Sequence, residues 1–321
     1  MKRYKLLNNV LGWAVFVIAA VTYILTLEST ASFWDCGEFI ASGYKLEVGH
    51  PPGNPIFMLT ARFFANFASS PSEVAYMVNL MSGLLSAATI LLLFWTITRL
   101  AQKIVLREGE TEETMSLGQM IAILGSGLVG ALAYAWSDTF WFSAVEGEVY
   151  AYSSFCTALV FWLILKWESV ADLPHANRYI ILIAYIIGVS IAVHLLNLLC
   201  IPAIVLVYYY RKYKNTDLKG SLIALLVSFV LIVLLLYGLV PGFVEVAGWV
   251  ELLFVNVFHL PFNSGVVFYF FLIVGVIAWA IYETYAQRSD KLIKISFLIS
   301  IVLVGIPFIG DGYIIGIILT A

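Results

Sequence analysis

Long, unbroken apolar runs limit the fold of this sequence more than any other feature. An α-helix crosses the hydrocarbon core of a bilayer with about 20 apolar residues, whereas barrel strands alternate in polarity at about every second position. A mean hydropathy of +0.97 and 12% charged residues also exclude an ordinary soluble domain. We predict an all-α polytopic membrane protein with about nine transmembrane helices, at residues 11–27, 74–98, 118–136, 149–166, 179–194, 195–210, 219–238, 264–282 and 292–306.

The first run is predicted to be a retained helix. The N-terminus is basic, but no small-residue cleavage site follows residues 11–27, as a signal peptide would require. Cys36, Cys156 and Cys200 are odd in number and scattered, which argues against a disulfide framework and against a metal-binding spacing.

Positive charges predict the topology. With a cytoplasmic N-terminus, fifteen of the seventeen Lys and Arg residues fall in cytoplasmic segments, and Lys45 and Arg62 fall outside. Cytoplasmic segments next to transmembrane helices carry such an excess of basic residues. We therefore expect the N-terminus inside and residues 28–73 as a long first outer loop.

The outer face predicted in this way is acidic. Its excess of carboxylates argues against nucleic acid or an anionic acceptor as a partner. It suits a surface that takes up protons or holds hydroxylated ligands. The eleven acids are Glu28, Asp35, Glu38, Glu47, Glu73, Asp138, Glu146, Glu148, Glu245, Glu251 and Asp311.

Two of these acids stand in the stretch WDCGEF, residues 34–39. If this stretch begins a helix, Asp35 and Glu38 lie on one face, because residues three apart are neighbours on a helix surface. Another interpretation stays open: Ser32 to Asp35 fits a capping box, in which Asp35 would only complete a helix start. A cap does not require the second acid.

A stiff loop and an amphipathic stretch follow in the same outer segment. In the sequence GHPPGNP, prolines restrict the backbone from Gly49 to Asn54, beside the acid pair. Residues 56–67, rich in Phe and containing Arg62, are expected to form a helix lying in the membrane interface, or alternatively a helix packed into the bundle.

Two further outer loops carry carboxylates. In residues 136–153, Glu146 and Glu148 precede a span and either complement its helix dipole or act in acid–base chemistry, with Tyr150 close by. A third outer loop is expected at residues 239–263, with Glu245 and Glu251, and its role is ambiguous.

A short hairpin is expected between two inner arginines. Arg178 and Arg211 both belong inside, so the intervening chain must cross twice and turn near His194 and Asn197. These polar residues either satisfy the backbone of the turn or, for His194, donate to a phosphate at headgroup depth.

Four motifs together resemble a known family. WDCGEF, GHPPGNP, VEGEVYAYSSF and GVSIAVHLLNLL are similar to those of a bacterial branch of the GT-C membrane glycosyltransferases, related to the eukaryotic plexin-type protein O-mannosyltransferases. The resemblance covers about residues 10–310 and implies one GT-C-like domain over residues 1–321. The chain ends on the apolar run 313–321, whereas the family that it resembles continues with more chain, so the resemblance implies that it is truncated or divergent at this end.

The resemblance implies transfer of mannose or a similar hexose from a polyprenyl-phosphate carrier to a hydroxyl, such as Ser or Thr of an exported protein, at the outer face of a bacterial inner membrane. No cofactor is expected besides the lipid-linked sugar as co-substrate, and no metal-binding residue is assigned. Asp35 would be the general base, supported by Glu38. The candidate substrate-binding residues are His50, Asn54, Arg62, Glu146, Glu148, Tyr150, His194 and Asn197.

Two other classes of protein stay open. A secondary transporter would place ionisable residues within its spans and show inverted repeats, whereas the central spans here carry almost no ionisable residue and no repeat is found. In a membrane scaffold without catalytic activity, the outer acids would only solvate the loops. Release of polyprenyl phosphate from a labelled sugar carrier would distinguish an enzyme from both.

Overall fold

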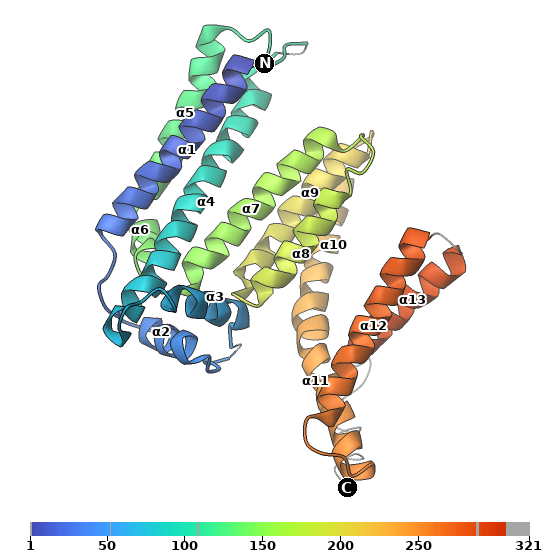
Figure 1. Ribbon diagram of the computed structural model, residues 1–321. Coiled ribbons are helices and arrows are strands. Elements are labelled where there is room, and N and C mark those ends of the chain that lie inside the picture. Colours follow the sequence, from blue (N-terminus) through green and yellow to red (C-terminus); the bar gives the residue numbers. More distant parts are fainter. Residues whose placement is uncertain (1, 52, 108, 287–288, 306–321) are drawn as a thin grey trace. The chain divides into compact units, whose positions relative to one another are not determined.

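The computed structural model describes residues 2–51, 53–107, 109–286 and 289–305 (Figure 1). All regular structure in these residues is helical, which confirms the predicted all-α class. The chain divides into two compact units, residues 1–224 and 225–321, and each is described by itself. The expectation of one domain over residues 1–321 stays a prediction. Asp311 and the apolar run 313–321 lie outside the described residues.

Seven helical segments among the described residues are long and apolar enough to cross a membrane. Two of the nine predicted spans are shorter helices: α8 (Arg178–Ile191) has 14 residues and α13 (Asp290–Gly305) has 16. The protein is therefore polytopic, as predicted. The seven segments are Arg3–Leu25, Pro71–Val105, Leu117–Ala135, Val149–Val170, Leu195–Lys212, Leu218–Val257 and Ser264–Ala286.

Helices α1 (Lys2–Leu25), α4 (Val74–Val105) and α5 (Leu117–Ala135) pack together in the first unit (Figure 1). Their shared core includes the fully buried side chains of Val15, Tyr23, Phe94 and Ile123. Tyr23 donates its hydroxyl proton to the carbonyl of Ala135 over 2.9 Å, so the polar end of this buried ring is satisfied.

Helix α7 (Val149–Val170) packs against α4, and the helical hairpin that follows it in the chain packs against α7. The chain leaves along α8, turns, and returns through the 3₁₀ helix η2 (Leu195–Cys200) and α9 (Ile201–Lys212). At its end, Arg211 forms an ion pair with Asp172, six positions before α8 begins. The segment therefore forms a hairpin whose two ends meet, as expected from Arg178 and Arg211; the side of the membrane on which it turns stays a prediction.

Three short helices gather at one end of the first unit: α2 (Cys36–Lys45), α3 (Pro55–Ala65) and α6 (Asp138–Ala144) (Figure 1). The helix expected at residues 56–67 is α3. It buries Phe57 and Ala61 against the bundle and exposes Phe63 on the opposite side. Its two faces fit both interpretations of this stretch, because the apolar exposed face is the kind that meets lipid.

The prediction of a loop over residues 239–263 is wrong. Helix α10 (Leu218–Val233) continues through the π-helical turn η3 (Leu234–Leu239), α11 (Val240–Leu252) and the π-helical turn η4 (Leu253–Val257). Proline breaks a regular helix because it lacks an N–H, but a π-turn directly before Pro241 rearranges the hydrogen bonds there. Glu245 and Glu251 therefore lie on a helix. In the second unit, α11 packs against α12 (Ser264–Ala286) and α13.

Candidate functional site

Asp35 stands at the start of α2. The helix begins at Cys36, so Asp35 occupies the cap position, and its side chain makes no capping hydrogen bond. The alternative of a capping box from Ser32 is wrong. Trp34 has a φ of 68°, in the left-handed region, and this turn separates Ser32 from the helix. The half-exposed Asp35 carboxylate is thus left available.

Glu38 holds the proline loop. One oxygen accepts a hydrogen bond from the backbone N–H of His50 over 2.6 Å, and the other lies 3.2 Å from Nδ1 of the His50 ring. These bonds, the backbone one first, lower the pKa of Glu38. Asp35, Glu38 and His50 lie close enough for one ligand atom of each to be within 4.8 Å of the others. The expected neighbouring of Asp35 and Glu38 is confirmed.

The loop after His50 is tightly shaped. A Cβ at Gly49 would lie 2.9 Å from Cε of Met58 and 3.2 Å from Oε1 of Glu38, and Gly53 has a φ of +87°. The backbone conformation at Gly53 therefore favours glycine, whereas a side chain at Gly49 would require Met58 and Glu38 to shift. Asn54 follows in the left-handed region, 2% exposed, and its side-chain oxygen is buried with no hydrogen-bond partner in the described structure.

Two buried carboxylates, those of Glu146 and Glu148, lie close to the start of α2. Glu146 and Glu148 are 6% and 4% exposed. Glu148 caps α7, accepting from the N–H of Val149 over 3.3 Å, and the thiol of Cys36 donates to it over 3.5 Å. The cap supports the helix-start interpretation of Glu148, and the thiol joins α2 to the start of α7.

Burial shifts the titration of both acids. It raises the pKa of Glu146, and it raises the pKa of Glu148 to about 7, with smaller contributions from the charges of Glu146 and Asp35. A carboxylate with a pKa near 7 exchanges a proton readily at neutral pH. The site therefore combines the half-exposed Asp35 with a buried acid that holds a proton easily.

Asn79 on α4 positions the chain that leads into this site. Its side chain is fully buried, and its amide nitrogen donates to the carbonyls of Glu28 and Thr30 over 2.8 and 3.1 Å. A Cβ at Gly147 would lie 3.0 Å from the Asn79 side-chain oxygen, so the acidic loop comes close here. Our sequence analysis missed Asn79; a lone amide in an apolar run was the available signal.

Arg62 is engaged locally. Its guanidinium donates to the backbone carbonyl of Tyr44 over 2.5 Å and lies 5.2 Å from the centre of the Tyr44 ring. It thereby satisfies a carbonyl near the C-terminus of α2 and joins α2 to α3.

His194 and Asn197 lie at the hairpin turn. His194 caps η2: Nδ1 accepts from the N–H of Leu196 over 3.2 Å, and burial lowers the pKa of the ring. The neutral ring then carries its proton on Nε2. The ring of Tyr150 lies 5.5 Å away. Asn197 is fully buried and accepts from Thr157, while its amide nitrogen has no partner in the described structure.

One apolar cluster contains residues of α2, which follows Asp35, and a residue of the hairpin turn beside His194. Phe39 of α2, Phe57 of α3, Val149 of α7 and Val193 of the hairpin turn are buried in it. The start of α3 is also bonded to the turn, because the N–H of Ile56 donates to the carbonyl of Ala192 over 3.1 Å. Elements far apart in sequence are therefore brought to one end of the first unit.

Asp35, Glu38 and His50 also form a group that could hold a divalent metal ion, since carboxylate and imidazole are suitable ligands. Both oxygens of Glu38 already accept from His50. A metal ion would therefore have to compete with the His50 side chain for the carboxylate of Glu38.

The described residues therefore belong to a polytopic helical membrane protein that gathers a half-exposed carboxylate, further acids and imidazoles at one end of its first unit. Residues 35–217, more than half of the chain, match the family "Protein O-mannosyl-transferase TMEM260 N-terminal domain". The chain belongs to this family, which confirms the resemblance read from the four motifs. The match begins at Asp35.

Two curated relatives carry the same name. The chain is 27% identical over 210 residues to the protein O-mannosyl-transferase TMEM260 of Mus musculus, covering 65% of this chain and 27% of the mouse protein. It is 23% identical over 190 residues to the protein of that name from Dictyostelium discoideum, covering 57% of this chain and 21% of that protein. The chain thus spans about a quarter of the length of these relatives. No solved structure matches significantly.

Proposed function

We propose that this chain carries the catalytic acids of a GT-C-type glycosyltransferase. It transfers mannose or a similar hexose from a polyprenyl-phosphate carrier to a hydroxyl of an exported protein, at the outer face of a bacterial inner membrane. The observation that carries the proposal is the position of Asp35, half-exposed at the start of α2 and without a capping bond, in a chain of this family.

In the proposed reaction, the acceptor oxygen forms a bond to the anomeric carbon of the sugar, and the bond from that carbon to the phosphate oxygen breaks. Polyprenyl phosphate leaves with the electron pair, and Asp35 takes the proton of the acceptor hydroxyl. Such general-base assistance contributes about 10²–10⁴ in rate. Nearby carboxylates stabilise an oxocarbenium-like sugar in the transition state.

Other candidate residues would serve binding. Glu38 and His50 hold the loop that borders Asp35, and the buried Glu148 supplies a neutral or charged neighbour according to pH. The leaving phosphate requires donors, and Nε2 of His194 is proposed as one. Arg62 is a weaker candidate than expected, because Tyr44 already engages its guanidinium.

The experiment uses purified protein with polyprenyl-phosphate mannose, labelled in the sugar, and a Ser/Thr-containing acceptor peptide. Release of polyprenyl phosphate together with labelled peptide supports the enzyme. Carrier binding without turnover supports a scaffold, and movement of the intact carrier across a vesicle membrane supports a transporter; either result contradicts the proposal.

A further inference from the structure

A cavity of about 430 Å³ lies at the end of the first unit opposite to Asp35. It is bordered by the first turns of α1, the last turns of α4 and α7, and Glu112 from the segment between α4 and α5. Its lining residues lie toward the start of the first candidate membrane segment and toward the end of two others. With these segments across a bilayer, the cavity would lie near the lipid headgroups. This position does not depend on which end faces the cytoplasm.

The charged lining of the cavity is mainly basic. Lys5, Arg99 and Lys166 face one carboxylate, Glu112, which lies 3.9 Å from Lys5. Among the described residues Lys166 forms no ion pair, and its ammonium lies 5.1 Å from the centre of the Trp162 ring. The lining therefore holds two more cations than carboxylates, and this net positive charge would attract an anion to the cavity.

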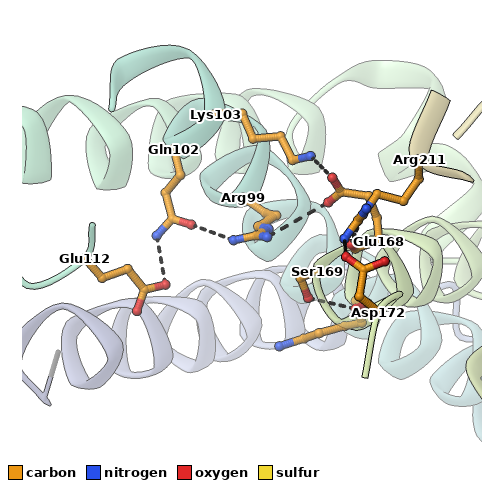
Figure 2. Close-up of polar contacts among 9 residues, drawn as sticks. Arg99, Gln102, Lys103, Glu112, Glu168, Ser169, Asp172 and Arg211 are labelled. Atoms are coloured by element: carbon orange, nitrogen blue, oxygen red, sulfur yellow. Dashed lines mark hydrogen bonds and ion pairs between the residues drawn. The ribbon is translucent and has the colours of Figure 1, made fainter. Parts of the chain in front are cut away.

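Neighbouring ion pairs leave this excess in place (Figure 2). Glu168 lies outside the lining and pairs with Lys103 over 2.6 Å, whereas its contact with Arg99 is 4.0 Å long. Arg99 also donates to Gln102 over 3.3 Å, and Gln102 donates to Glu112 over 3.4 Å. These bonds hold Arg99 and Glu112 in fixed positions at the border of the cavity.

Polar and aromatic groups complete the lining. Thr98 and Gln102 are 1% and 5% exposed, and the buried side-chain oxygen of Asn8 has no hydrogen-bond partner in the described structure. This oxygen has almost no accessible surface, so it could accept from a ligand hydroxyl once the Asn8 amide turns toward the cavity. Trp95 and Trp162, with ring centres 6.0 Å apart, form an aromatic wall of the kind found at membrane interfaces.

We propose that this cavity binds the headgroup of an anionic, hydroxyl-bearing phospholipid such as phosphatidylglycerol. The phosphodiester would lie between Lys5, Arg99 and Lys166, and a headgroup hydroxyl would donate to Asn8. The ligand would hold α1, α4 and α7 together at this end of the bundle, away from the acids near Asp35. This site is separate from the proposed transfer reaction.

The test measures binding by native mass spectrometry and the melting temperature of the full chain in neutral detergent. Phosphatidylglycerol, phosphatidylcholine with the same acyl chains, and inorganic phosphate are compared. We expect phosphatidylglycerol to bind at least about tenfold more tightly than phosphatidylcholine, and Lys166→Gln and Lys5→Gln each to weaken it about fivefold. Lys166 is exposed, so its replacement should leave folding intact.

Lys214→Gln is the matched control, because Lys214 is exposed near the end of α9 and does not line the cavity. Equal binding of the two lipids would overturn the proposal, as would equal losses in Lys166→Gln and the control. Stabilisation by inorganic phosphate equal to that by phosphatidylglycerol would overturn the lipid assignment in favour of a free anion.

Discussion

The thiol of Cys36 donates a hydrogen bond to the carboxylate of Glu148 over 3.5 Å, across 112 positions of sequence. This bond joins the first residue of α2 to the cap of α7. Because Asp35 directly precedes Cys36, the bond also holds the proposed base against the buried acids. The site thus depends on long-range packing as much as on the local WDCGEF motif.

Glu148 should make stability depend on pH. Its pKa is raised from 4.5 to about 7 in the folded protein, so the neutral form is the one that folding favours. Below pH 4.5, Glu148 is neutral in both the folded and the unfolded chain and does not lower the free energy of unfolding. As pH rises from 4.5 through 7, the unfolded chain loses this proton more readily than the folded one, and the free energy of unfolding falls by up to about 3 kcal/mol. Melting temperatures of wild type and Glu148→Gln between pH 5 and pH 9 check this.

In the Glu148→Gln variant, the fall in melting temperature from pH 5 to pH 9 should become smaller. Glu110→Gln is the matched control, since Glu110 is an acid of opposite shift, its pKa being lowered chiefly by the backbone N–H of Arg107. Identical pH profiles for wild type and Glu148→Gln would show that Glu148 is charged in the folded protein throughout.

Glu38 and His50 should act as one unit. Replacing either, by Glu38→Gln or His50→Ala, removes contacts that hold the proline loop. We expect faster proteolysis near residues 47–50 and a transfer rate reduced less than by loss of Asp35. A double-mutant cycle should show that the two effects are not additive. Additive effects would mean that the contacts do not hold the loop.

The same contacts should depend on pH. Because the pKa of Glu38 is lowered in the folded protein, the contribution of Glu38 to the stability of the fold is lost as pH falls below about 4.5.

Two substitutions separate the two roles of His194. His194→Ala removes both the η2 cap and the Nε2 donor, whereas His194→Asn keeps a side-chain acceptor suited to a cap. We expect His194→Ala to lower stability by about 1 kcal/mol and His194→Asn to restore most of it. Carrier binding should be weak in both variants. Normal carrier binding by a stable His194→Asn variant would exclude His194 as a phosphate donor.

Cysteine labelling tests the orientation of the chain. Asn54 would be a poor position for a probe, since it is 2% exposed, whereas Val48 in the same loop is 87% exposed. With Cys36, Cys156 and Cys200 all buried, the native background is low. An impermeant reagent added to intact cells should label Val48→Cys and miss Gly109→Cys. Labelling of Gly109→Cys alone would invert the predicted topology.

Sequence reasoning predicted the features that depend on local periodicity. Apolar length identified the helices, and three-residue spacing placed Asp35 beside Glu38. Contacts set by tertiary packing could not be predicted, such as the Cys36–Glu148 bond and the bond from Asn79 to the carbonyl of Glu28. Local backbone geometry also misled: the left-handed Trp34 excludes the capping box. Similarly, the π-helical turn before Pro241 could not be predicted from the sequence, and it continues a helix where a loop was expected.

The direct test of the proposed function is sugar transfer by the Asp35→Asn variant. Asparagine keeps the shape of the side chain but cannot accept the proton, so transfer from polyprenyl-phosphate mannose should fall by at least about 10² while the melting temperature and membrane insertion stay unchanged. Asp138→Asn, at an acid in the first turn of α6, is the matched control and should transfer normally. Near-normal transfer by Asp35→Asn would contradict the assignment of Asp35 as the general base.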